Sequence, residues 1–215
     1  MTFTLFIDDQ CEILKRLLEL YYPHGCRIID LTYGKGNLWN TMANNPILRR
    51  KYRITACDAA PTSRKVQKKN LLNDDYTSLG RHDCALFDPP YLIGRVSFDY
   101  AKVGRHSWSA DPNRAKYTAN QSLDHFNQLL ECLKQKAPAF LKPGGLLLVK
   151  IMDPRKDGTL IPHHVNITNI LHDSFELIDL AIYVRLGATT WKLRGHLQNL
   201  HGYWLIFKLK KTREA

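Results

Sequence analysis

Residues 30–36, DLTYGKG, are the most informative stretch for the fold, and they form the end of the apolar segment 27–31 and the turn after it. That segment is typical of a buried strand, and residues 38–48 have the pattern of a helix. Glycine at positions 34 and 36 lets the backbone turn sharply and approach a nucleoside-sized ligand without a clash from a Cβ atom. The order of strand, glycine turn and helix therefore predicts a cofactor site at the end of a strand.

The spacing of these glycines differs from that of a dinucleotide site. The pattern G-x-G-x-x-G would need a third glycine at position 39, where Trp39 would block close helix packing and the approach of a pyrophosphate. NAD and FAD are therefore disfavoured. Asp58 ends the next apolar segment, residues 54–58, where a carboxylate is well placed to accept hydrogen bonds from both hydroxyls of a ribose. The alternative is a turn-forming carboxylate ahead of Pro61.

A second motif, Asp88-Pro89-Pro90-Tyr91, follows the apolar segment 83–87. Two consecutive prolines lock the backbone and leave the Pro89 carbonyl with no neighbouring N–H competing for it. A carboxylate and a fixed carbonyl aimed at one point would hold an exocyclic amino group, while the Tyr91 ring stacks on the base that carries it. The alternative is an ordinary proline-containing turn after a strand.

The remaining pattern alternates between helical and strand character. Helices are expected over residues 8–22 and about 122–137, and strands over 52–57, 146–151, 175–183 and 203–209, while 66–75 has no clear type. The last two strands have no helix pattern between them, so we expect an antiparallel pair. We therefore predict a single α/β domain over residues 1–215, a Rossmann-like, doubly wound, mostly parallel sheet of seven strands with an antiparallel C-terminal strand pair.

The charge balance points to a partner class. The chain has 31 Lys and Arg against 20 Asp and Glu, a net charge of +11 that favours phosphate-rich partners, nucleic acid first. No apolar run approaches the roughly 20 residues of a membrane span, and the N-terminus lacks the positive region of a signal peptide. Five widely spaced cysteines without a C-x-x-C pair predict reduced thiols and an intracellular, cytoplasmic protein. No metal is expected, and His163 and His164 are predicted to be polar loop residues.

Basic residues gather in two stretches without clear periodicity. Residues 92–121 form a long basic loop that we expect to cover the substrate site. Its basic residues are interleaved with aromatic ones, which suits phosphate contacts combined with base stacking: Arg95, Lys102, Arg105, Arg114 and Lys116. Lys192 and Arg194 precede the last strand and are placed to follow a phosphate backbone from the neighbouring side. For both stretches, a solvated charged loop is the alternative.

At the glycine stretch and at D-P-P-Y, the sequence resembles S-adenosylmethionine-dependent amino methyltransferases, and most of all small prokaryotic or phage DNA N6-adenine methyltransferases. The similarity continues through LKPGG at 141–145, LLLVK at 146–150 and HGYWLIF at 201–207. The order of the two main motifs excludes the circularly permuted branch. Two departures stand out: Gly202 occupies a position where the family often has an acid, and the chain has no separate target-recognition domain. We therefore expect low or short sequence specificity.

The resemblance implies a role for each matched residue. The methionine part of S-adenosylmethionine would be surrounded by Asp30, Thr32, Tyr33, Gly34 and Gly36. Asp58 would hold the ribose. Asn70, in preference to Asp74, would contact the adenine, although either can instead cap a turn. The catalytic loop would be Asp88, Pro89, Pro90 and Tyr91, which would hold the N6 amino group of a flipped adenine for direct methyl transfer without a covalent intermediate.

Other activities stay open at this stage. The same hydrogen-bonding arrangement suits an RNA methyltransferase acting on guanine N2 or adenine N6, or a DNA cytosine-N4 methyltransferase. The lack of an appended RNA-binding domain favours DNA over RNA. A catalytically silent nucleic-acid-binding module would explain the fold and charge but not the intact motif. A small-molecule or protein-glutamine methyltransferase would explain the motif but leave the net charge of +11 without a role.

Overall fold

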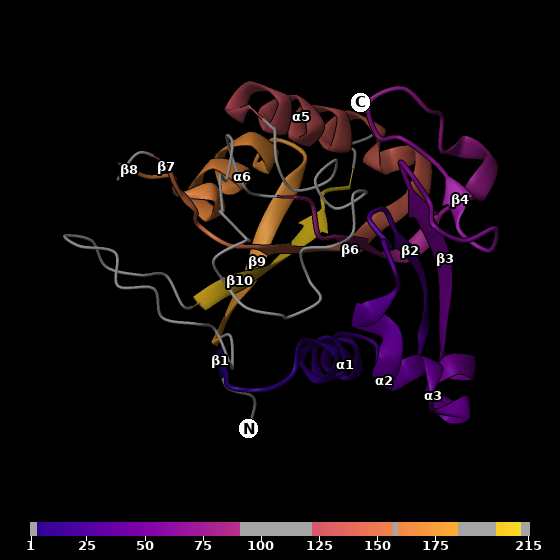
Figure 1. The fold of residues 1–215 in the computed structure, drawn as a ribbon. Helices are drawn as coiled ribbons and strands as arrows, with labels where there is room; N and C mark the ends of the chain where they lie inside the picture. The colour runs from indigo at the N-terminus through magenta and orange to yellow at the C-terminus, as the bar shows by residue number, and fades with distance from the viewer. Residues whose placement is uncertain (1–3, 91–121, 157–158, 185–200, 212–215) are drawn as a thin grey trace, which may run out of the picture.

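The computed structural model describes residues 4–90, 122–156, 159–184 and 201–211 of the chain. One mixed sheet runs through it, with helices on both faces (Figure 1). The strands of this sheet lie in the order β1, β9, β10, β6, β5, β2, β3, β4. Their bounds are β1 Leu5–Phe6, β2 Cys26–Asp30, β3 Tyr52–Asp58, β4 Gln67–Lys68, β5 His82–Phe87, β6 Leu141–Ile151, β9 Phe175–Val184 and β10 His201–Leu209; β7 Arg155–Lys156 and β8 Thr159–Leu160 form a separate hairpin.

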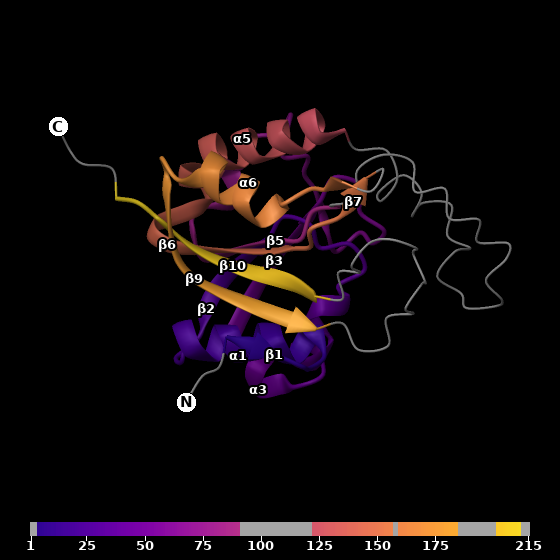
Figure 2. The same ribbon diagram turned by 90° about the vertical axis from the view of Figure 1, so that its left-hand side faces the viewer.

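The four central strands are parallel. Ile28 of β2 is in register with Ile54 of β3 on one side and with Cys84 of β5 on the other, and β5 pairs in parallel with β6. Strand β10 runs antiparallel to both β6 and β9, as the side view shows (Figure 2). The predicted fold class is therefore confirmed. Because the central strands are parallel, their carboxyl ends meet at one edge, where ligands bind in open sheets of this kind.

Each face of the sheet has its own apolar core. The helices are α1 Gln10–Tyr21, α2 Asn40–Ala43, α3 Pro46–Lys51, α5 Leu123–Phe140 and α6 His163–Leu171, with short 3₁₀ turns η1 Asn37–Trp39 and η2 Thr77–Leu79. The helices α1, α2 and α3 cover one face, where Ile13, Trp39 and Trp204 are buried. The helices α5 and α6 cover the other, where Phe126, Phe140 and Ile167 are buried.

The boundaries differ from the predicted ones in several places. The sheet has eight strands rather than seven, because two-residue strands, β1 and β4, flank the six strands that were predicted with residue ranges. Strand β6 begins at Leu141, five residues before the predicted start. The helix expected over 38–48 is three short pieces, since Asn45 caps a new helix whose first residue is Pro46. Helix α5 begins after its Ser122 cap as expected but continues to Phe140, beyond Pro138 in its last turn.

The prediction that His163 and His164 are loop residues is wrong, because both lie in the first turn of α6. The His163 side chain is buried, with its ring 4.5 Å from that of Phe126 between centroids. His164 hydrogen-bonds through Nδ1 to Asp153 Oδ2 at 2.6 Å and stacks on Tyr203. Pro162 and the apolar spacing after it were the missed signals of a helix start.

All five cysteines are free thiols, and three of them, Cys26, Cys57 and Cys84, are buried. Burial raises the pKa of Cys26 to about 12 and that of Cys57 to about 11, so these thiols stay protonated and pack as apolar side chains. Within the described ranges, no helix is both long enough and apolar enough to cross a membrane.

Candidate functional site

The glycine turn begins at Asp30, whose side chain is only 1% exposed at the carboxyl end of β2. Its two carboxylate oxygens accept separate hydrogen bonds. The Thr32 backbone N–H donates to Oδ1 at 2.9 Å, and the indole N–H of the buried Trp39 donates to Oδ2 at 2.6 Å. Trp39, at the position where a dinucleotide site would have its third glycine, is buried in the core and holds the Asp30 carboxylate.

Two glycines shape the turn itself. Gly34 and Gly36 have φ values of 56° and 76°, in the left-handed region that side chains rarely adopt. A Cβ atom on Gly36 would lie 2.6 Å from the hydroxyl oxygen of Tyr33, so the tyrosine ring packs directly over that glycine. The left-handed φ values at both positions and the packing of Tyr33 on Gly36 explain why these residues are glycine, and contact of the turn with a cofactor stays a prediction.

Asp58 fastens the glycine turn to the neighbouring strand. Its carboxylate, 7% exposed at the end of β3, accepts the Gly34 N–H through Oδ2 and the Ala60 N–H through Oδ1, both at 2.8 Å. These bonds correspond to the turn-forming role, which was the alternative to a ribose contact in the sequence analysis. A carboxylate has about four acceptor positions, so a ribose role for Asp58 stays compatible with these two bonds and stays a prediction.

The second motif is joined to the first by a hydrogen bond. Asp88, which follows β5, donates its backbone N–H to the Thr32 hydroxyl oxygen at 2.7 Å. Both oxygens of its carboxylate accept hydrogen bonds from Lys150 Nζ, Oδ1 at 3.1 Å and Oδ2 at 2.9 Å. The two motifs therefore meet at the carboxyl edge, and the Asp88 carboxylate is fixed in place.

Lys150 is the site residue that sequence reasoning missed. It lies in β6 within the apolar run 146–151, and its side chain is only 8% exposed, with Nζ 6.0 Å from the centre of the Tyr183 ring. A lone lysine in a buried strand was the available signal, because a buried ammonium requires a partner. Gly202 makes room for the same tyrosine: a Cβ there would lie 2.5 Å from the Tyr183 hydroxyl oxygen.

Asn70 and Asp74 both cap the turn that follows β4. The Leu72 N–H donates to Asn70 Oδ1 at 2.9 Å, and the Asn70 N–H donates to Asp74 Oδ2 at 2.6 Å. The turn-capping alternative thus describes what both side chains do in this structure. Contact of either with a cofactor adenine stays a prediction.

Several predicted residues lie outside the described residues. Tyr91 is one, together with the long basic loop 92–121, whose contacts were predicted for Arg95, Lys102, Arg105, Arg114 and Lys116, and the second basic stretch with Lys192 and Arg194. No three His, Cys, Asp or Glu side chains are grouped as metal ligands in the part of the chain that the structure describes.

Asp30 carries a pKa raised to about 7, chiefly by burial, with a further contribution from the negative charges of Asp88 and Asp58. The hydrogen bonds from Trp39 and Thr32 oppose this rise. The native state therefore binds the Asp30 proton more tightly than the unfolded chain, whose ordinary Asp pKa is about 3.9. Stability contributed by this protonation is present at low pH and is lost as the pH rises towards 7.

We expect the free energy of unfolding of the wild type to fall by about 2–3 kcal/mol between pH 5 and pH 8 from this group alone. Urea unfolding of the wild type and of Asp30→Asn at several pH values isolates the contribution of Asp30 to the free energy of unfolding, because all other titrating groups are common to both proteins. The difference in stability between the two proteins should change with pH by that amount. A difference that is constant from pH 5 to pH 8 would show that Asp30 titrates normally.

The fold relates the chain to known proteins, although its sequence matches no family model and no curated protein. It is similar to 1,6-didemethyltoxoflavin-N1-methyltransferase from Burkholderia thailandensis, crystallised with S-adenosylhomocysteine, with a TM-score of 0.53 and 13% identity over 94% of this chain and 79% of that one. The N-methyltransferase NodS from Bradyrhizobium japonicum, also with S-adenosylhomocysteine, gives 0.52 and 11% identity over 93% and 87%.

TrmN from Thermus thermophilus gives a TM-score of 0.53 with 12% identity over 93% of this chain, which spans about half of that protein, 48%. At such low identity these likenesses concern the fold alone. The chain thus has the Rossmann-like fold seen in these methyltransferases. Its glycine turn and its D-P-P motif lie at the carboxyl ends of the parallel strands, where open α/β sheets generally bind ligands.

Proposed function

We propose that this protein transfers a methyl group from S-adenosylmethionine to the exocyclic N6 amino group of adenine in DNA, with low or short sequence specificity. The observation that carries the proposal is the placement of Asp88, whose backbone N–H is bonded to Thr32 of the glycine turn and whose carboxylate is held by both contacts of Lys150. An acceptor fixed next to a cofactor turn is the arrangement that amino-group methylation requires.

The residues present fit S-adenosylmethionine. Gly34 and Gly36 have the left-handed φ values that the turn requires, and the almost buried Asp58 carboxylate at the neighbouring strand end suits ribose hydroxyls. Asp30, Thr32 and Tyr33 complete the turn that would hold the methionine part. When bound there, S-adenosylmethionine supplies an electrophilic methyl group on a sulfonium sulfur. The fold's likeness to two N-methyltransferases crystallised with S-adenosylhomocysteine supports this cofactor.

The protein's part in the reaction is to hold the acceptor amino group. The Asp88 carboxylate accepts one amino hydrogen and the Pro89 carbonyl the other, so that the nitrogen lone pair is directed towards the cofactor. Lys150 leaves acceptor positions of Asp88 available, because a carboxylate offers about four. With Lys150 neutralising its charge, Asp88 acts by orienting the amino group, and Tyr91 would stack on the base.

A nucleic acid is the proposed class of substrate because of the charge of the protein, and DNA is proposed because of the resemblance to DNA N6-adenine methyltransferases. A net charge of +11 favours a polyanion over a small neutral substrate. The glycine turn and the Asp88 carboxylate together suit any planar amino group, so adenine N6 rests on the resemblance of D-P-P-Y to the N6-adenine branch.

Calorimetry and mass spectrometry test the two halves of the proposal. S-adenosylmethionine should bind in the presence of EDTA, and Asp58→Ala should weaken that binding by about 1–3 kcal/mol through lost hydrogen bonds. Asp173→Ala is the matched control, because this carboxylate is 65% exposed and lies outside the site. Nucleosides from DNA and RNA co-expressed with the protein should show N6-methyladenine in DNA.

Each half has its own refutation. Absence of S-adenosylmethionine binding to the wild type would refute the enzyme class. Methylated nucleosides found only in RNA would show that RNA is the substrate. N4-methylcytosine in DNA without N6-methyladenine would show that cytosine is the methylated base.

A further inference from the structure

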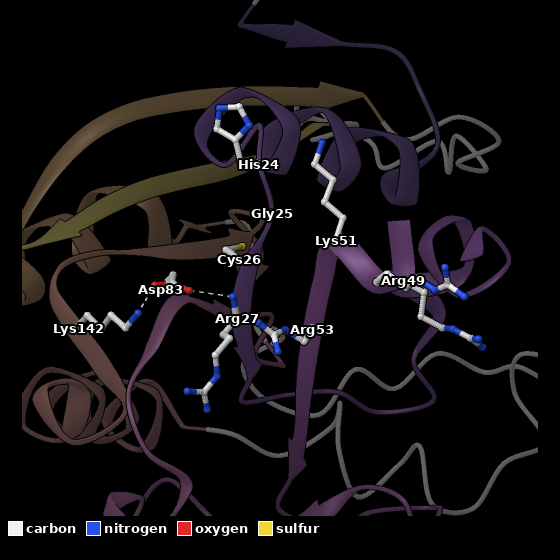
Figure 3. Close-up of a pocket in the computed structure, with 10 residues that line it drawn as sticks. His24, Gly25, Cys26, Arg27, Arg49, Lys51, Arg53, Asp83 and Lys142 are labelled. Atoms are coloured by element: carbon white, nitrogen blue, oxygen red, sulfur yellow. Dashed lines mark hydrogen bonds and ion pairs between the residues drawn. The ribbon is translucent and has the colours of Figure 1, made fainter. Parts of the chain in front are cut away.

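A basic hollow lies at the opposite edge of the sheet from Asp30, Asp58 and Asp88. It is an open cavity of about 610 Å³ at the amino ends of β2, β3, β5 and β6, within the usual size range of ligand sites. Figure 3 shows its lining residues, which come from these strand starts, from the turn between α1 and β2, and from the end of α3. The lining residues are His24, Gly25, Cys26, Arg27, Arg49, Arg50, Lys51, Arg53, Asp83 and Lys142.

The charge of the hollow is strongly one-sided, because six of its lining residues are Lys or Arg and only Asp83 is acidic. That carboxylate is already engaged by Lys142 Nζ at 2.6 Å and by the Arg27 backbone N–H at 2.9 Å. Burial acts to raise the pKa of Asp83, but these two contacts and the nearby positive charges outweigh it and hold the pKa below its usual value. Asp83 therefore stays ionised and already has its partners.

Some of the cations have a role in the fold. Lys51 lies over the Tyr52 ring, 5.3 Å from its centre, and Lys142 pairs with Asp83. Arg49 and Arg50 lie in the last turn of α3, where positive charge complements the helix dipole. These contacts account for four of the six.

Arg53 has no such contact, and the Arg27 guanidinium acts on Asp83 only through its charge, which helps to lower the pKa of that carboxyl. Arg27 and Arg53 are register partners on adjacent parallel strands, so both exposed side chains lie on the same face of the sheet (Figure 3). Neither guanidinium forms an ion pair with any residue in the described ranges. Like charges opposite one another on neighbouring strands destabilise a sheet, so folding alone does not favour this pair. Paired guanidinium groups are well suited to bind phosphate oxygens.

We propose that this hollow binds phosphate groups of a nucleic-acid backbone, as a second contact distinct from the carboxyl-edge site. The inference shares with the proposed function only the nucleic-acid partner. Strand β2 has five residues, so the amino ends of the strands, where the hollow lies, are separated from their carboxyl ends by roughly 16 Å. A duplex advances about 3.4 Å per base pair, so it must extend at least about five base pairs beyond the catalytic contact to reach the hollow.

The test uses the double variant Arg27→Gln/Arg53→Gln in the full chain. Its control, Lys15→Gln/Arg16→Gln, removes the same charge from α1, where both residues already pair with acidic side chains outside the hollow. Fluorescence anisotropy with a labelled DNA duplex of about 24 base pairs gives the affinity at several salt concentrations. We expect the log-log salt slope to flatten by about one to two units in the hollow variant and to stay unchanged in the control.

Equal slopes in the hollow variant and the control would overturn the proposal. Thermal unfolding with inorganic tripolyphosphate separates a backbone from a small phosphorylated ligand. Stabilisation of the wild type but not of the hollow variant, together with unchanged duplex slopes, would assign the hollow to a small ligand and overturn the nucleic-acid assignment. If the salt slopes of the hollow variant and the control differ as expected but the wild type methylates no nucleic acid, the proposed function is refuted. The phosphate-binding role of the hollow is then still supported.

Discussion

Asp88→Ala is expected to reduce methyl transfer by about 10³-fold or more while changing the dissociation constant of S-adenosylmethionine by less than about threefold. In the proposed reaction this carboxylate would hold the acceptor amino group, whereas the glycine turn and Asp58 would hold the cofactor, so the two functions rest on different residues. Single-turnover kinetics with DNA and calorimetry with the cofactor measure the two effects separately.

The structure also predicts a side effect of this substitution on stability. Removing Asp88 leaves the Lys150 ammonium, 8% exposed, without its carboxylate, at a cost of about 3 kcal/mol. The double variant Asp88→Ala/Lys150→Met removes both charges and should regain most of that stability without regaining activity. Recovery of methyl transfer in the double variant would show that Asp88 matters only for folding.

Lys150→Met is the second substitution with a large expected effect. We expect the turnover number to fall by about 10–100-fold with little change in the KM for S-adenosylmethionine, because a misplaced orienting group costs rate rather than cofactor binding. Lys150 is a positioning residue in this account, since it contacts Asp88 and acts through that carboxylate. Lys150→Arg keeps the cation and should restore part of the rate.

The two single variants should differ in stability. Lys150→Met leaves the Asp88 carboxylate, which is 23% exposed and so can be partly hydrated, at a cost of about 1–2 kcal/mol. This is less than the cost of the more deeply buried ammonium in Asp88→Ala. Urea unfolding of both single variants and the double variant gives the coupling energy of the pair. Additive losses, or a Lys150→Met variant with wild-type turnover, would contradict the positioning role.

Much of this arrangement was predictable because its signals are local. A glycine turn and a double proline placed directly after apolar segments indicate strand ends, and parallel strands bring their carboxyl ends to one edge. Gly34, Gly36, Asp58 and Asp88 therefore lie at the predicted edge. The antiparallel C-terminal pair followed from the absence of a helix pattern between its strands.

Periodicity, glycine and proline act on neighbouring residues, so the fold class, the positions of the main strands along the chain and the strand ends that carry both motifs could be predicted from the sequence. Which distant side chains meet depends on the three-dimensional fold. The pairing of Lys150 with Asp88 depends on the register of β5 and β6, and that of Trp39 with Asp30 on the turn's path across the core. Arg27 and Arg53 become neighbours through the register of β2 and β3, because strand pairing joins residues that no local pattern relates.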